Sequence, residues 1–225
     1  MEVTERNMIK NQKYIFLYAL ILTVVVFNIG IFMGYMLEVS RAGRINDLYI
    51  ISEMKLLDQL TQKGALDVLD LNCGLLVKEN IRFGDEIFQE ALQIYEYEKA
   101  NRINDEIILY HKRFDLLRAL FWMNSMAIKE KCSSSYHNVV YFYKYNEPSI
   151  EQESKQKFFS NLLMELKGRQ GDNIMLIPIA ADNDISSINL LVEKYEITEL
   201  PVVLIDEKIK VTEINAIEDI EKYLV

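Results

Sequence analysis

Three short runs rich in β-branched and aromatic residues decide the fold of the C-terminal third of the chain: NVVYFY at residues 138–143, NIMLIPIA at residues 173–180 and PVVLID at residues 201–206. Residues of these types fit the pleated, buried surface of a sheet. We therefore predict three buried strands.

Helical stretches separate these strands. Ser149 to Arg169 carries apolar residues at intervals of three or four, and Ser186 to Tyr195 is a second, shorter stretch. Strands that alternate with helices are typical of parallel crossovers. A tight turn at Asp206–Glu207 then predicts an antiparallel hairpin with residues 208–214, and residues 216–224 predict a short closing helix. The expected fold class is α/β, in the order β-α-β-α-β-β-α.

This order, with a proline opening the third strand in ITELPVVLI at residues 197–205, resembles the thioredoxin-like superfamily over residues 138–224. The resemblance implies a cis Leu200–Pro201 peptide that faces the loop after the first strand. In that family the loop carries the redox dithiol, but here it reads KYNEPSI at residues 144–150 and holds no cysteine. Thiol–disulfide exchange needs a thiolate nucleophile and a second, resolving thiol. We therefore expect a domain that is not an oxidoreductase.

The resemblance also implies a binding site. Family members without the dithiol use the loop beside the proline, with its free backbone groups, to hold peptides or partner domains. The implied partner-binding residues are Tyr145, Glu147, Ser149, Leu200 and Pro201. The whole layout, with its N-terminal span and helical segment, further resembles uncharacterised archaeal membrane proteins.

Residues 43–131, before the strands, are predicted to be helical. The clearest helix has one apolar stripe, formed by Ile103, Ile107, Tyr110, Phe114, Leu117 and Phe121. Gly64 and Gly74 predict breaks, and Gly84–Asp85 predicts a turn and N-cap before a further helix. We expect three or four helices in an antiparallel bundle or hairpin. Composition changes at Cys132, which we interpret as the boundary with a domain at residues 138–225.

An apolar block precedes the helical segment. Tyr14 to Leu37 reads YIFLYALILTVVVFNIGIFMGYML, 24 residues without Asp, Glu, Lys, Arg or His. At about 1.5 Å rise per residue they make roughly 36 Å of helix, which exceeds a hydrocarbon core of about 30 Å. A cleaved secretory signal has a shorter apolar region and a small-residue cleavage site. The block therefore predicts one uncleaved transmembrane helix after a tail of residues 1–13.

Charges on either side of the block suggest its orientation. Arg6, Lys10 and Lys13 precede it, while Arg41 and Arg44 follow it. This small excess favours a cytoplasmic N-terminus and an extracytoplasmic C-terminal part in a cell membrane.

Cys73 and Cys132 are the only cysteines. They can form a structural disulfide in an oxidising compartment, remain buried thiols in a reducing one, or have a catalytic or metal-binding role. His111 and His137 have no second His or Cys at the spacing of a zinc site. The sequence therefore predicts neither a metal nor a cofactor.

The remaining signals limit the function. Net charge is -9 and no basic stripe is interleaved with aromatic residues, so we expect no nucleic-acid partner. The predicted function is a membrane-tethered, non-catalytic, thioredoxin-like interaction or scaffold protein, with the bilayer and another protein as partners. Two alternatives stay open: an envelope thiol–disulfide or folding factor that uses Cys73 and Cys132, and a subunit of a larger membrane complex.

Overall fold

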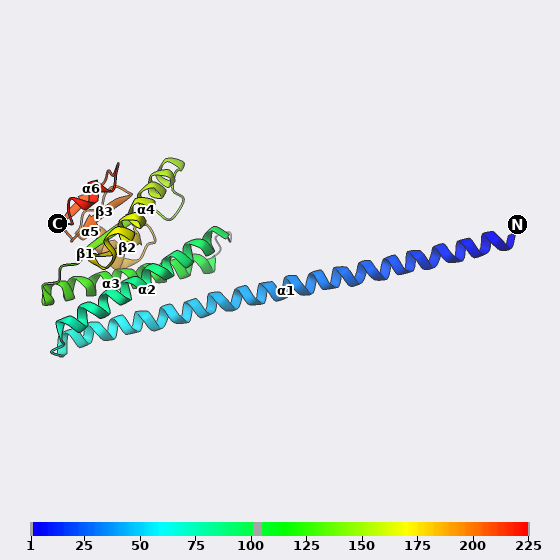
Figure 1. The fold of residues 1–225 in the computed structure, drawn as a ribbon, viewed down its shortest axis with the longest axis horizontal. Helices are drawn as coiled ribbons and strands as arrows, with labels where there is room; N and C mark the ends of the chain where they lie inside the picture. Colours follow the sequence, from blue (N-terminus) through cyan, green and yellow to red (C-terminus); the bar gives the residue numbers. More distant parts are fainter. Residues whose placement is uncertain (1, 101–104, 225) are drawn as a thin grey trace. The chain divides into compact units, whose positions relative to one another are not determined.

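The computed structural model describes residues 2–100 and 105–224, which form six α-helices, one short 3-10 helix and a four-stranded sheet (Figure 1). Met1, Val225 and Ile103, the first residue of the predicted stripe, lie outside the described residues. The chain divides into two compact units, Met1–Ile51 and Ser52–Val225. Helix α1 (Glu2–Val68) makes up the first unit and enters the second. Its section Tyr14–Leu37 is long and apolar enough to cross a membrane, and no side chain in it is buried.

Helices α2 (Cys73–Ala100) and α3 (Asp105–Cys132) form an antiparallel hairpin (Figure 1). A disulfide with an S–S distance of 2.10 Å joins Cys73 at the start of α2 to Cys132 at the end of α3. Asn72 begins α2, because its Oδ1 accepts a hydrogen bond from the backbone N–H of Leu75 at 3.2 Å. The predicted helical character of this segment is confirmed for the described residues, as is a break just before Gly74.

Two other predicted breaks are wrong, because helices continue through Gly64 and Gly84. A Cβ at Gly64 would meet nothing within 4 Å. This glycine lowers helix propensity by about 1 kcal/mol, which does not end a helix that is docked on its neighbours. A Cβ at Gly84 would lie 3.0 Å from Met175 Sδ and 3.0 Å from Phe121 Cζ. Gly84 is therefore not a turn residue; it lets α2 approach α3 and the sheet closely.

The strands β1 (His137–Tyr143), β2 (Ile174–Ala180), β3 (Val202–Ile205) and β4 (Ile209–Val211) lie in the order β2-β1-β3-β4. All four predicted strands are present. The expectation that helical connections make every crossover parallel is wrong for β3, which is antiparallel to β1, while β1 and β2 are parallel. The reason is that β3 begins at the end of the sheet where β2 finishes. The chain between them, with the nine-residue α5 (Ser186–Lys194), does not return along the sheet.

The last elements are shorter than predicted. After the hairpin, β4 has three residues, and α6 (Glu218–Glu221) has four. Asp206 and Glu207 form the hairpin turn with positive φ angles of 47° and 59°, and Lys208 N–H donates to Ile205 O at 3.1 Å. Such angles match the twist of the flanking strands; they are uncommon outside glycine, asparagine and aspartate, so Glu207 is the unusual residue here.

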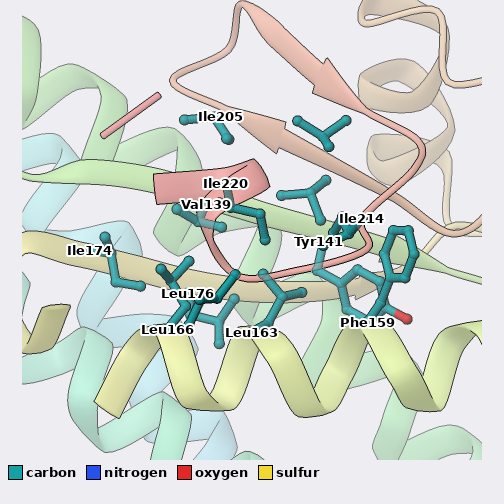
Figure 2. Close-up of a cluster of buried hydrophobic side chains, with 13 residues drawn as sticks. Val139, Tyr141, Phe159, Leu163, Leu166, Ile174, Leu176, Ile205, Ile214 and Ile220 are labelled. Atoms are coloured by element: carbon teal, nitrogen blue, oxygen red, sulfur yellow. The ribbon is translucent and has the colours of Figure 1, made fainter. Parts of the chain in front are cut away.

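Helices cover both faces of the sheet. On one face, α4 (Ile150–Gln170), the 3-10 helix Gly171–Asn173 that follows it, and α6 enclose a buried apolar cluster. Figure 2 shows side chains of α4 pointing toward the strands; the labelled members of the cluster are Val139, Tyr141, Phe159, Leu163, Leu166, Ile174, Leu176, Ile205, Ile214 and Ile220. On the other face, α2 and α3 pack against β2, and α3 also packs against β1 and α5. The composition change at Cys132 is thus a change of secondary structure inside the compact unit Ser52–Val225.

We expect Gly84→Leu to lower the free energy of unfolding by about 1–3 kcal/mol, because the new side chain has to displace buried Met175 and Phe121. Thermal unfolding of the full chain in detergent, followed by the fluorescence of its single tryptophan, measures this. The matched control is Gly168→Ala on the exposed face of α4, where a Cβ meets nothing within 4 Å and stability should rise by about 0.5–1 kcal/mol. Equal stability of Gly84→Leu and wild type would contradict the tight contact.

Candidate functional site

The structure brings the predicted loop and Pro201 to the same end of the sheet. β1 and β2 both end there, with Tyr143 opposite Ala180. β3 begins there, directly after Pro201, with Val202 opposite Phe142. We call the segments at this end, residues 144–149, 181–185 and 198–201, the strand-end site.

Three of the predicted residues, Glu147, Leu200 and Pro201, lie in the strand-end site, and they differ in exposure. The Leu200–Pro201 peptide is cis, as the resemblance implied, with Pro201 buried and Leu200 half-buried. Glu147 is exposed and has a positive φ of 44°. Among the described contacts, no hydrogen bond involves the backbone of residues 198–200, and Thr198 and Glu199 are exposed. These backbone groups are available to a ligand.

Tyr145 and Ser149 have structural roles instead. The Tyr145 ring stacks on the His111 ring, with 3.8 Å between the centroids. Ser149 is the N-cap of α4: its Oγ accepts from Gln152 N–H at 3.2 Å, and its own N–H donates to Gln152 Oε1 at 3.1 Å. This capping box ends the loop and fixes where α4 begins.

The first half of the loop has no free backbone N–H groups, which corrects the expectation taken from the resemblance. Lys144 N–H donates to Gln156 Oε1 at 2.7 Å. Tyr145 N–H and Asn146 N–H donate to the two carboxylate oxygens of Asp182 at 2.7 and 2.8 Å. Asp182 lies in the neighbouring segment after β2, so it holds the two loops together. Its carboxylate occupies the donors that a bound peptide would otherwise use.

A buried carboxylate lies on α3 beneath the loops. Asp115 is 0% exposed; its oxygens accept from Asn183 Nδ2 at 2.6 Å, from Arg118 Nη1 at 3.1 Å and from Ala180 N–H at 3.4 Å. His111 Nε2 lies 3.4 Å from Asp115 Oδ2. Burial raises the pKa of Asp115 above its ordinary value, although His111, Arg118 and Asn183 oppose this. The carboxylate has no access to solvent, so it positions its neighbours and cannot act on a ligand directly.

His111 extends this anchor to β1. Its Nε2 also lies 2.8 Å from Tyr143 Oη, and its ring is 6% exposed. Helix α3 therefore holds the end of β1, the loop through Tyr145, and the segment after β2 through Asp115. The strand-end site is a preorganised surface on a rigid support.

From the sequence, His111 was considered only as a zinc ligand, and Asp115, Arg118 and Asp182 were not singled out. The sequence does contain a signal for Asp115 and Arg118. Polar and aromatic residues recur along α3 at spacings of four and three, directly beside the predicted apolar stripe; these are His111, Asp115, Arg118, Trp122 and Ser125. A second stripe of this kind indicates a helix buried on two sides. Nothing local to Asp182 reveals its contact with a loop 37 residues away.

A second polar cluster lies at the opposite end of the sheet. There the Asp206–Glu207 turn meets the start of β1 and the end of α3. Glu207 Oε1 accepts from Trp122 Nε1 at 2.6 Å and from Asn138 Nδ2 at 3.1 Å, and Asn138 Oδ1 accepts from Ser125 Oγ at 2.7 Å. We call this set of contacts, with those of Asp206, the hairpin network.

Asp206 is the charged centre of the hairpin network. Its carboxylate accepts from Lys129 Nζ at 2.5 Å, from His137 Nδ1 at 2.6 Å and from Asn138 N–H at 2.9 Å. Burial alone would raise the pKa of Asp206, but these three hydrogen bonds outweigh it and hold the pKa below its ordinary value. Glu207 is different, because burial raises its pKa despite the bonds from Trp122 and Asn138.

The disulfide is remote from the strand-end site. Cys132 precedes the start of β1, whereas the predicted loop follows its end, and seven strand residues span about 23 Å. Both cysteines are bonded to each other, so neither offers a free thiol. The described residues contain no group of three or more His, Cys, Asp or Glu side chains able to hold a metal ion.

Asp206→Asn should lower the free energy of unfolding at neutral pH by roughly 1–3 kcal/mol, since it removes charge-assisted bonds from Lys129 and His137. The folded-state pKa of Asp206 is depressed, so its contribution is present above the unfolded value of 3.8 and is lost as pH falls through the lower folded value. The gap between variant and wild type should therefore close below about pH 4. Trp122 fluorescence reports unfolding, and exposed Asp172→Asn is the control. A gap that persists unchanged into acid would contradict this account.

No protein-family model matches the chain, and no curated protein matches its sequence. What this chain does is therefore inferred from its own residues and their contacts.

Proposed function

We propose that the chain is a single-span membrane protein that presents a thioredoxin-like domain as a binding module, with no dithiol chemistry. The observation that carries this proposal is the strand-end site. There a cis proline and unpaired backbone groups of residues 198–200 stand beside a loop that holds no cysteine. The order of strands and helices and the cis Leu200–Pro201 peptide support the thioredoxin-like assignment.

The proposed ligand is an extended segment of a partner protein. Such a segment forms main-chain hydrogen bonds with unpaired N–H and C=O groups, and neighbouring side chains provide selectivity. On one side of the strand-end site Asp182 has already bound the loop donors, so the segment lies against residues 198–200. Exposed Glu147 and Glu199 belong to segments at this end of the sheet, and their negative charge favours a segment that carries Lys or Arg.

The apolar span and the disulfide together support a position at a cell membrane, with the C-terminal unit outside the cytoplasm. Tyr14–Leu37 meets the length and composition of a transmembrane helix, and we propose that it anchors the protein in a cell membrane. Disulfides persist in oxidising compartments, so the Cys73–Cys132 bond favours an extracytoplasmic position for the unit Ser52–Val225 and a cytoplasmic N-terminus.

Partner capture tests the site. A photo-crosslinking amino acid at Thr198 should capture a partner in intact membranes, and Glu147→Lys should reduce the yield about tenfold, because it reverses a charge beside the path. Glu147 is exposed, so this variant should fold normally. Asp172→Lys, an equal charge reversal before β2 at the other end of the sheet, should leave the yield unchanged. If the crosslinking yield falls equally in both variants, or falls in neither, the strand-end site is not where the partner binds.

Sidedness is tested independently. In intact cells, protease added outside should degrade the unit Ser52–Val225, and non-reducing gels should show one bonded cysteine pair. Replacing both cysteines with alanine should lower the free energy of unfolding by about 4 kcal/mol in the chain-entropy model. The opposite result is that both cysteines are alkylated in freshly lysed cells and that external protease leaves the unit Ser52–Val225 intact. It would place this unit in the cytosol.

A further inference from the structure

In the end of α1, residues 52–68, the fully buried side chains are polar, while several large apolar side chains face outward. Ser52 and Gln59 are 0% and 1% exposed, whereas Met54 and Leu57 are each 58% exposed. Val68 on the same outer face is 81% exposed. An amphipathic helix on a soluble domain normally does the reverse. Its exposed apolar side chains are therefore not part of this unit's core.

Hydrogen bonds fix this orientation. Asn124 Nδ2 on α3 donates to Gln59 O at 2.9 Å and to Gln59 Oε1 at 3.0 Å. Lys55 Nζ lies 2.7 Å from Glu90 Oε2 on α2, and Tyr110 Oη donates to Glu90 Oε1 at 3.1 Å. Turning the apolar face inward would leave these buried groups unpaired, at a cost of about 1–3 kcal/mol each. The outward apolar face is thus a stable feature of the fold.

The spacing of the outer face suits another helix. Met54, Leu57, Thr61, Gly64 and Val68 follow one another at intervals of three and four. This is the seam spacing of two packed helices. A Cβ at Gly64 would meet nothing within 4 Å, so a partner backbone can approach closely there. We call these five residues the α1 stripe.

The charges beside the α1 stripe select the kind of helix. Exposed Glu53 and Asp58 flank the α1 stripe on its two sides. Glu53 lies on the side that faces α3, where Arg113 Nη2 is 3.5 Å from Glu53 Oε1. A second copy of the chain in the same orientation would place Glu53 of one helix opposite Asp58 of the other, a repulsive pair. An anionic lipid surface would be repelled in the same way. A helix with cationic flanks meets no such repulsion.

We infer that the α1 stripe docks an amphipathic helix of a partner protein whose apolar seam is flanked by Lys or Arg. This surface lies on α1 and uses none of the residues of the strand-end site. The two binding surfaces can therefore fail separately.

Two synthetic helices test the inference. Each is a fluorescent peptide of about three heptads with Leu at the seam, one with Lys and one with Glu at the flanking positions. Binding to the full chain in phosphatidylcholine nanodiscs is followed by anisotropy. We expect the Lys peptide to bind at least about tenfold more tightly than the Glu peptide, and Leu57→Glu to weaken it by about tenfold or more. Asp58→Lys should weaken the Lys peptide and strengthen the Glu peptide.

Leu190→Glu on α5 is the matched control, because Leu190 is 67% exposed and lies away from the stripe. The Leu190→Glu variant should bind the Lys peptide as tightly as the wild type does. Equal weakening by Leu57→Glu and Leu190→Glu, or a peptide preference that Asp58→Lys does not move, would mean general attraction to an acidic protein and overturn the inference. A wild-type dimer in light scattering that Leu57→Glu converts to monomer would overturn it in favour of a second copy.

Discussion

Helix α3 is packed on two sides, and its contact with the sheet positions the rest of the unit Ser52–Val225. In one of its stripes, Phe114, Leu117 and Phe121 are each no more than 1% exposed. The adjacent stripe contains His111, Asp115 and other polar groups that meet the strands and their loops. Most buried polar side chains of this helix have to be paired, because each buried group left unpaired costs about 1–3 kcal/mol. In the described part of the chain, single atoms such as Asn124 Oδ1 still have no hydrogen-bond partner. The placement of α3 is therefore set by hydrogen bonds as much as by apolar area.

Those hydrogen bonds are gathered at the two ends of the sheet. At the strand-end site Asp115 binds the segment after β2, and at the other end the hairpin network binds the Asp206–Glu207 turn to Trp122 and Lys129. Apolar contacts are non-directional and would tolerate a helix that slides along the sheet. Directional bonds at both ends remove that freedom. The same bonds give a role to Glu207, a residue uncommon at positive φ, because its carboxylate, like that of Asp206, binds α3.

Much of this unit was predictable because the signals are local. Runs of β-branched and aromatic residues located three strands, and the tight turn at residues 206–207 located the fourth. Ser149 and Asn72 show the chemistry of helix N-caps. The direction of β3 was predicted wrongly, because strand–helix alternation favours parallel crossovers and does not reveal that the short connection through α5 fails to return along the sheet. The role of Gly84 was missed, because the same residue marks a turn or a close helix contact and only the fold distinguishes them. The bond from Asp182 to the loop was missed because it joins residues far apart in sequence.

The contact between Asp182 and the loop fixes the shape of a loop that has no dithiol. The loop holds no cysteine, and Asp182 binds the backbone donors that shape it. Its form then no longer depends on a ligand, so binding a partner segment requires little ordering of the loop. The unpaired groups that remain belong to residues 198–200, before Pro201, and are held by the sheet. We propose that such a site, with its fixed acceptors and donors, selects a partner segment by shape and charge.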